Sequence, residues 1–321
     1  MEFKPQTFDQ KVEEQTQDKS KDNFEILNAL EEQFAHPERV RLGGEEVNLY
    51  DIAPKKLKFE TPTVFAPGFS ATPIVHEPNI VGIAKDGRRV IAVDSPQGLE
   101  RPTVTEQDAA GHAEVELAKL SSIMEALNER GIEKTDGVAH SEGGVYLILA
   151  AWLNSDKFRN IVLVEPGGMI GKDNVFRLVK GMANELVGQF KDEAKRTDLD
   201  RQPKKLQSPM LPLRAIGADL RRSWGSVKAI AESDIIEMLK DLKDRGIHVS
   251  IIHGVDDKVF PMDRVQKELG PDAITGFYSV RGGHNEVFLR PEQYTGAISA
   301  ALDALDAKSK KEEAARSSST T

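Results

Sequence analysis

From residue 61 onward, short apolar segments alternate with longer segments of helical periodicity, and this alternation constrains the fold more than any other feature. The segments with the length and apolar content of buried strands are 61–66, 89–93, 136–139, 160–164, 248–253 and 274–280. The clearest helical segments between and after them are 107–130, 143–153 and 291–305. Strands and helices that alternate in this way form a mostly parallel, doubly wound sheet with helices on both faces. The sequence therefore predicts an α/β fold.

The remaining segments divide the chain further. The divisions that we expect, in chain order, are a mobile N-terminal arm at 1–22, a helix and hairpin at 23–59, the first part of the core at 60–168, a helical insertion at 169–245, the second part of the core at 246–306 and a disordered tail at 307–321. Both ends are rich in charged and small polar residues, which is why we expect them to be unstructured. The insertion interrupts the alternation with helical periodicity only, so we interpret it as a cap.

Composition excludes several classes of function. The chain has no cysteine, so disulfides, thiolate catalysis and cysteine-ligated zinc are excluded. Its net charge of −9 gives it no general attraction for nucleic acid or for anionic lipid. The sequence has no apolar run long enough to cross a bilayer and no secretory signal pattern at its start. We therefore expect a soluble cytoplasmic protein that neither binds nucleic acid nor inserts into a membrane.

Ser141 is the strongest candidate for chemistry. It lies in the segment VAHSEGG at 138–144, between a predicted strand and a predicted apolar helix. A sharp strand-to-helix turn exposes a serine hydroxyl, and it requires small residues two positions before and two positions after the serine. Those residues are Ala139 and Gly143. The start of the helix also directs free N–H groups at developing negative charge. A serine that only caps the helix is the alternative.

This turn resembles the nucleophile elbow of the α/β-hydrolases, and the resemblance extends over residues 60–305. It departs from the usual elbow in its first residue, which is Ala139 in place of glycine. The resemblance implies that Ser141 is the nucleophile of a serine hydrolase of the esterase or lipase type. In this fold the catalytic residues follow one another in the chain order Ser, Asp, His. A serine at this position argues against epoxide and haloalkane hydrolases, which have an aspartate there.

His284 is the candidate base. It lies in the segment VRGGHNE at 280–286, after the last predicted strand, where the family carries its catalytic histidine. Imidazole suits the role because its pKa lies near the working pH of most enzymes. His140 is adjacent to Ser141 and is expected to point away from it. His248 and His253 lie in or beside a predicted strand and are expected to be structural.

Asp257 is the candidate acid, in the segment GVDDKVFP at 254–261. The family places a carboxylate after the strand that precedes the last one, where it orients the imidazole and stabilises the imidazolium. The match selects Asp257 over Asp256. Two alternatives stay open, because Asp256 is adjacent and because Glu165 follows another core strand, where some family members carry their acid. An aspartate that only caps the following helix is a third interpretation.

The oxyanion hole is expected to use the backbone N–H groups of Phe69 and Glu142. Phe69 belongs to the segment APGF at 66–69, after the first parallel strand, where the family supplies one donor. Pro67 stands where the family often has histidine. Glu142 follows Ser141 and opens the helix, where a negative side chain is favoured by the helix dipole. A polar contact near the substrate pocket is the alternative role for its carboxylate.

The function that we predict is hydrolysis of a carboxylic ester or related acyl compound through an acyl-enzyme on Ser141, without a cofactor or a metal ion. The partner is a small-molecule acyl substrate. The same triad could serve amide, thioester or carbon–carbon hydrolysis, cofactor-free peroxidation or acyl transfer. A non-catalytic homologue that binds a small ligand is the alternative from another class. The sequence has no phosphate loop, dinucleotide fingerprint or zinc-protease helix.

Overall fold

The computed structural model describes residues 8–42, 44–69, 71–94, 112–195, 220–270 and 273–319. An eight-stranded sheet with the order β1-β2-β4-β3-β5-β6-β7-β8 forms its centre. The strands are β1 (Glu38–Leu42), β2 (Glu45–Ile52), β3 (Thr63–Ala66), β4 (Val90–Val93), β5 (Thr135–His140), β6 (Phe158–Val164), β7 (His248–Gly254) and β8 (Gly276–Val280). The six strands β3 to β8 pair in parallel, whereas β1 pairs antiparallel with β2 and β2 pairs antiparallel with β4. The predicted doubly wound α/β fold is confirmed, and β1 and β2 form the predicted hairpin.

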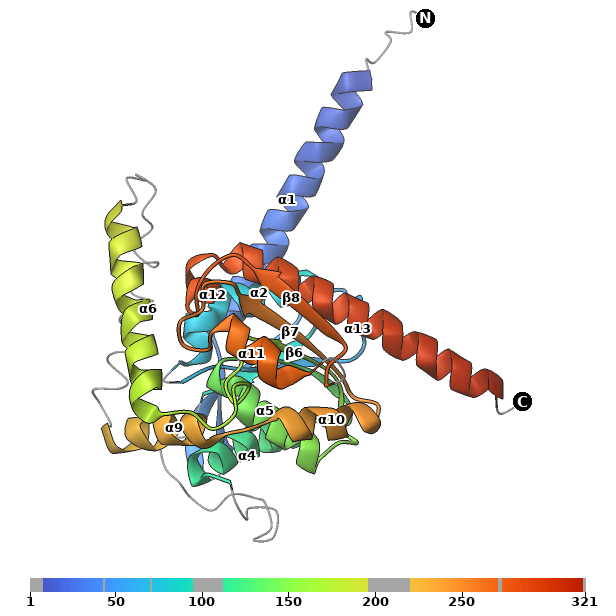
Figure 1. The fold of residues 1–321 in the computed structure, drawn as a ribbon. Coiled ribbons are helices and arrows are strands. Elements are labelled where there is room, and N and C mark those ends of the chain that lie inside the picture. The colour runs from blue at the N-terminus through green and yellow to red at the C-terminus, as the bar shows by residue number, and fades with distance from the viewer. Residues whose placement is uncertain are drawn as a thin grey trace, which may run out of the picture.

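Helices cover both faces of the sheet (Figure 1). The helices on one face are α1 (Phe8–Ala35), α2 (Glu77–Lys85) and α13 (Pro291–Ser319). The helices on the other face are α4 (Glu114–Glu129), α5 (Glu142–Leu153) and α10 (Ile236–Asp244). The shorter elements are η1 (Pro73–His76), α11 (Met262–Leu269) and α12 (Glu286–Leu289), and the helices α6 (Val175–Lys195) and α9 (Leu220–Glu232) contact each other. No helix within the described ranges has an apolar stretch that could cross a bilayer.

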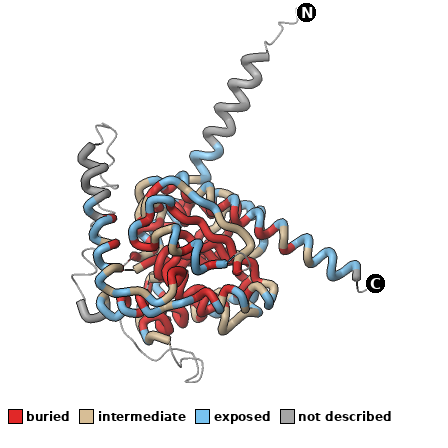
Figure 2. Tube along the Cα trace, in the orientation of Figure 1, coloured by how far each residue is buried: buried red, intermediate tan, exposed pale blue. Residues whose placement is uncertain are grey.

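Two hydrophobic cores lie on opposite faces of the sheet, and Figure 2 shows the buried residues gathered there. Successive strand residues alternate between these cores, because side chains point to opposite faces along a strand. In β6, Ile161 and Leu163 belong to one core, and Val162 and Val164 belong to the other. A strand buried on both faces is apolar throughout, which is why these strands are visible in the sequence as short apolar runs.

The structure differs from the expectation at both ends of the chain. Residues 8–22, expected to be part of a mobile arm, are helical within α1, and residues 307–319, expected to be a disordered tail, continue α13. Glu, Gln, Lys and Ala are good helix formers, so a charged composition does not by itself exclude a helix. In α13 the side chain of Ser309 donates a hydrogen bond to Asn160 at 2.8 Å, and Glu312 lies 3.1 Å from the His248 ring. These contacts attach the segment to the strands of the sheet.

Within the predicted insertion at 169–245, the described regular elements are the helices α6, α9 and α10. Residues 196–219, and residues 107–111 of the predicted helix at 107–130, lie outside the described ranges. However, α10 packs against α5 and β7 and connects two neighbouring parallel strands. It therefore belongs to the layer that covers the sheet, and α9 contacts α4 of the same layer.

Asp136 lies at the start of β5 and is the centre of a buried charge cluster. Its carboxylate accepts hydrogen bonds from Arg159 at 3.0 and 2.9 Å, and Arg88 lies 3.4 Å away. The side chains of Asp136 and Arg88 are fully buried. Arg88 also contacts Asp303 at 2.8 Å and stacks over the Phe59 ring. The cluster joins the sheet to α13 at the edge opposite to the carboxyl ends of the strands.

Asp136→Asn should lower the free energy of unfolding by about 3–5 kcal/mol, because it removes the buried carboxylate that Arg88 and Arg159 share. Urea titration followed by circular dichroism measures this change. Glu237→Gln is the matched control: it removes an exposed carboxylate that pairs with Lys240 at 2.6 Å. The control should change stability by less than about 1 kcal/mol. Equal effects of the two substitutions would contradict the role that we assign to the cluster.

Candidate active site

Ser141 occupies a strained turn between β5 and α5. Its φ of 54° and ψ of −122° are unusual for a residue with a side chain, and such a conformation costs about 1–3 kcal/mol. The turn is held by backbone hydrogen bonds at 3.0 Å, from Ser141 N–H to Val164 and from Gly144 and Gly167 N–H to Ser141. The surrounding backbone therefore imposes the strain, as in a site where one side chain must be presented in a fixed direction.

Gly143 is required by the close approach of another loop. A Cβ atom at this position would lie 2.2 Å from the Ala66 carbonyl oxygen and 2.8 Å from that of Pro67. Ala139, two residues before the serine, is fully buried in β5 between Ala66 and Leu163 of the neighbouring strands. The positions two residues before and two residues after Ser141 thus have the small side chains that such a turn requires.

Ser141, His284 and Asp257 form a continuous hydrogen-bonded chain. The Ser141 hydroxyl lies 2.9 Å from Nε2 of His284, and Nδ1 of His284 lies 2.9 Å from Oδ2 of Asp257. Because a carboxylate can only accept, Nδ1 carries the proton and Nε2 is free to accept the hydroxyl proton. All three residues are buried. They come from the ends of β5, β7 and β8, so the three separate motifs found in the sequence meet at one point.

Asp257 is held by the loop that it begins. Its Oδ1 accepts the N–H groups of Val259 at 2.7 Å and of Phe260 at 2.9 Å, which leaves Oδ2 for His284. The turn-forming role and the orienting role considered for this residue are therefore compatible. Asp256 is exposed, and its backbone N–H bonds to Gly282. Glu165 lies 4.0 Å from Nδ1 of His284, farther than Asp257.

The loop that carries Phe69, one of the two expected oxyanion donors, comes close to the turn at Ser141. A Cβ atom at Gly68 would be 3.0 Å from Cβ of Ser141, so the loop that carries Phe69 passes directly over the turn. Pro67, which replaces a histidine of the family pattern, accepts a hydrogen bond from the Tyr146 hydroxyl at 2.6 Å. In the described ranges, the backbone hydrogen bonds outside helices and strands use neither the Phe69 nor the Glu142 N–H.

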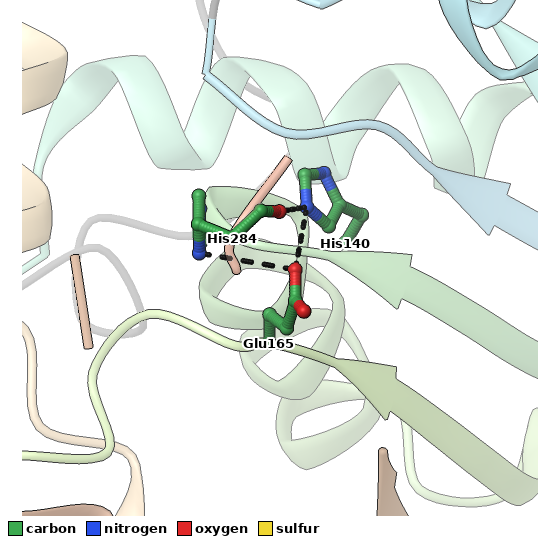
Figure 3. A group of neighbouring side chains, drawn as sticks. All are labelled: His140, Glu165 and His284. Atoms are coloured by element: carbon green, nitrogen blue, oxygen red, sulfur yellow. Dashed lines mark hydrogen bonds and ion pairs between the residues drawn. The ribbon is translucent and has the colours of Figure 1, made fainter. Parts of the chain in front are cut away.

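Behind the triad, His140 and Glu165 contact His284 (Figure 3). Nε2 of His140 lies 3.3 Å from the His284 carbonyl oxygen, and Oε2 of Glu165 lies 3.7 Å from the same nitrogen. The Tyr294 hydroxyl donates to Oε1 of Glu165 at 2.7 Å. The side chain of His140 thus contacts the backbone of the loop that carries His284.

Burial disfavours charge on the side chains of this supporting layer. It raises the pKa of Glu165 well above the usual range, and the charge of Asp257 raises it further. Burial also holds the pKa of His140 well below its usual value, assisted by His76 and His284. A neutral Glu165 does not compete with Asp257 for an imidazolium. Ligand atoms of His140, Glu165 and His284 lie within 4.8 Å of one another, close enough to hold a metal ion, but Nε2 of His140 and Nδ1 of His284 already have hydrogen-bonding partners.

The helix α6 lies against the loops that carry Asp257 and His284. Gly181 approaches the Lys258 backbone so closely that a Cβ atom would lie 2.6 Å from its carbonyl oxygen. Four residues later, Glu185 accepts the Lys258 N–H at 3.0 Å and its carboxylate also packs against Gly283. Figure 1 shows α6 beside the body of the molecule, with α9 crossing its end. This part of the insertion is therefore in contact with the site.

Two residues beside the site are absent from the sequence-based assignment. Lys119 and Tyr146 are buried, and Nζ of Lys119 lies 2.7 Å from the Glu142 carboxylate. The carboxylate of Glu142 thus faces α4 and makes an internal ion pair. The available signal is the pair of charges at Glu116 and Lys119 within an otherwise apolar stretch of α4, since buried charges occur in partnered sets.

Similar structures identify the fold. An enol-lactonase from Burkholderia xenovorans LB400 matches with a TM-score of 0.59 and 14% identity, over 83% of this chain and all (100%) of that one. An esterase from Thermogutta terrifontis matches with a TM-score of 0.59 and 17% identity, over 84% of this chain and 99% of that one. A bromoperoxidase from Bacillus anthracis gives a TM-score of 0.59 and 17% identity, over 84% and 100%. The protein has the α/β-hydrolase fold.

At the sequence level, a protein of Mycobacterium phage D29 with the provisional name non-heme haloperoxidase is 24% identical over 253 residues. The matched region covers 75% of this chain and 87% of the relative. No protein-family model matches the chain. The structural matches, which cover more than four fifths of this chain, confirm the predicted fold.

Gly143→Ala should abolish most activity and lower stability, because the added methyl group would overlap the Ala66 carbonyl and displace the turn. Gly296→Ala is the matched control, since it places the same methyl group in a helix with nothing within 4 Å. Alanine in a helix interior should stabilise the control by up to about 1 kcal/mol. Thermal unfolding and hydrolysis of p-nitrophenyl esters measure both effects. Wild-type activity in Gly143→Ala would contradict the close approach at the turn.

Proposed function

We propose that the protein is a serine hydrolase that cleaves a carboxylic ester or related acyl compound through an acyl-enzyme on Ser141. The observation that carries the proposal is the chain of two 2.9 Å contacts from the Ser141 hydroxyl through His284 to Asp257. A serine hydroxyl becomes a useful nucleophile only when a base takes its proton and donors stabilise the oxyanion. The contacts of His284 with Ser141 and Asp257 support its role as the base, and we assign the donor role to the N–H groups of Phe69 and Glu142.

In the proposed reaction, Oγ of Ser141 bonds to the acyl carbon while its proton passes to Nε2 of His284. Asp257 stabilises the resulting imidazolium through Nδ1. The carbonyl oxygen becomes an oxyanion that the N–H groups of Phe69 and Glu142 would bind. The carbon–oxygen bond then breaks, and the leaving alcohol takes the proton from Nε2. Water, deprotonated by His284, releases the acid by the same steps and restores Ser141.

The helix α6 supports an assignment of the insertion as a cap that shapes the substrate pocket. Its contacts with Lys258 and Gly283 join it to the loops that carry the acid and the base. A small acyl compound is the class of substrate that such a covered site would admit. The net charge of −9 supports the expectation that nucleic acid is not a partner.

A second candidate is cofactor-free peroxidation, which the haloperoxidase-like relative in phage D29 and the bromoperoxidase-like structure favour. It would use the same acyl-enzyme, with hydrogen peroxide in place of water as the attacking group. The peroxide oxygen would bond to the acyl carbon, and a peracid would leave. Bromination of an activated diketone in acetate, bromide and hydrogen peroxide distinguishes this reaction from simple hydrolysis.

Ser141 should be labelled by a fluorophosphonate probe, and Ser141→Ala should not be labelled. The wild type should hydrolyse at least some members of a series of p-nitrophenyl esters of increasing chain length, whereas Ser141→Ala should lose activity by a factor on the order of 10³ or more. Mass spectrometry of the labelled peptide identifies the modified residue. Equal labelling of both proteins would contradict the proposal, and an unlabelled wild type would favour the non-catalytic, ligand-binding alternative.

Asp257→Asn should reduce kcat by a factor on the order of 10³–10⁴, because an amide no longer holds His284 in the required tautomer. Asp256→Asn is the matched control in the next position of the chain and should remain within about twofold of the wild type. Steady-state kinetics with one ester substrate compares them directly. A larger loss in Asp256→Asn would transfer the acid role to that residue, and little loss in either would point to Glu165.

A further inference from the structure

Glu142, the residue that follows Ser141, has a fully buried carboxylate. It begins α5, and its side chain meets Lys119 of α4, whose Nζ lies 2.7 Å from Oε2. The Lys119 side chain is only 7% exposed. At this distance the charges attract strongly, although the angle falls short of a regular hydrogen bond. A buried charge is costly without a partner, so each group depends on the other for its place.

The same cation faces a second residue of α5. Nζ of Lys119 lies 5.7 Å from the centre of the Tyr146 ring, and the Tyr146 hydroxyl donates a hydrogen bond to the Pro67 carbonyl at 2.6 Å. Glu142 and Tyr146 are four residues apart and therefore share one face of α5. Lys119 thus contacts both Glu142, the first residue of α5, and Tyr146, whose hydroxyl bonds to the loop of Pro67. We refer to this series of contacts as a connection from Glu142 to the Pro67 loop.

Each end of this connection is next to one expected oxyanion donor. Glu142 itself carries one of the N–H groups, and Phe69 is two residues beyond Pro67. An oxyanion hole works only when both donors lie about 2.7–3.1 Å from the same oxygen. We propose that Lys119 is a positioning residue: through its contacts with Glu142 and Tyr146 it sets the relative placement of the Glu142 and Phe69 N–H groups. This inference rests on the proposed function, because it assigns those groups to an oxyanion.

Glu116 lies one turn before Lys119 in α4 and is also buried. Burial, and then the charge of Glu142, raises the pKa of Glu116 to about 7. Below neutral pH Glu116 is mostly protonated, so the Lys119 ammonium then pairs with the Glu142 carboxylate. Glu116, Lys119 and Glu142 are all buried, which distinguishes this set from a general cluster of exposed charges.

The test compares Lys119→Met, Lys119→Arg and the control Lys240→Met, which removes an exposed lysine paired with Glu237. Two quantities are measured: kcat and KM for p-nitrophenyl butyrate, and Ki for an aryl trifluoromethyl ketone, whose serine adduct places an oxyanion in the hole. In Lys119→Met, kcat should fall and Ki should rise by the same factor, about tenfold or more, with KM within about twofold. Lys119→Arg should recover part of both losses, and the control should equal the wild type.

Lys119→Met could fail to fold, because it leaves Glu142 without a cation, so Tyr146→Phe provides a second test. It keeps the ring and removes only the hydroxyl that bonds to Pro67. A correlated change in kcat and Ki, with KM unchanged, is expected here too. A role in stability alone would lower Tm and leave kcat and Ki of the folded protein unchanged, and that result in either variant would overturn the inference.

The wild type separates this inference from the proposed function. If Ser141 of the wild type is neither labelled by the fluorophosphonate nor bound by the ketone, both proposals fail together. If the wild type is labelled and active, but folded Lys119→Met or Tyr146→Phe retains its kcat and Ki, only the role of Lys119 fails.

Discussion

The pairing of β5 with β3 on one side and β6 on the other determines where Ser141 lies relative to the loops around it. It aligns Ala66 with Ala139, and His140 with Val164, so the loops that follow the three strands begin at the same edge of the sheet. Ser141 is thereby placed between the Pro67 loop and Glu165. Parallel strands always present their carboxyl ends together, which is why an open α/β sheet collects chemistry at this edge. The remaining parts, His284 and Asp257, arrive from β8 and β7 along the same edge.

A strained serine and a buried imidazole can persist there only because the surrounding groups are fixed and mostly neutral. Backbone hydrogen bonds hold the turn at Ser141, and two backbone N–H groups hold one oxygen of Asp257. Glu165 and His140 lie behind the imidazole, and burial raises the pKa of the first and lowers the pKa of the second, which favours the neutral form of both. Asp257 is the carboxylate in direct contact with His284, and it stabilises a developing imidazolium without competition from a charged Glu165. In a low-dielectric site such an undivided interaction is worth more than it would be in water.

The fold and the three central residues were predictable because each has a local signature. Apolar runs mark strands buried on both faces, and small residues flank Ser141 because its turn is crowded. The charged ends of the chain were harder to interpret. Their composition resembles that of a disordered segment, whereas α13 is attached to the sheet through Ser309 and Glu312, whose partners are distant in the sequence. Lys119 was missed for the same reason, since its partner Glu142 lies on another helix and only the packing of α4 on α5 brings them together.

Detection of an acyl group on Ser141 during turnover tests the central claim most directly. The wild type would be mixed with a p-nitrophenyl ester, quenched in acid within the first turnovers, digested and analysed by mass spectrometry. The proposed mechanism predicts the added mass of the acyl group on the peptide that contains Ser141, formed together with an initial release of nitrophenol. Hydrolysis without any acylated peptide, or an acyl group on another residue, would contradict it.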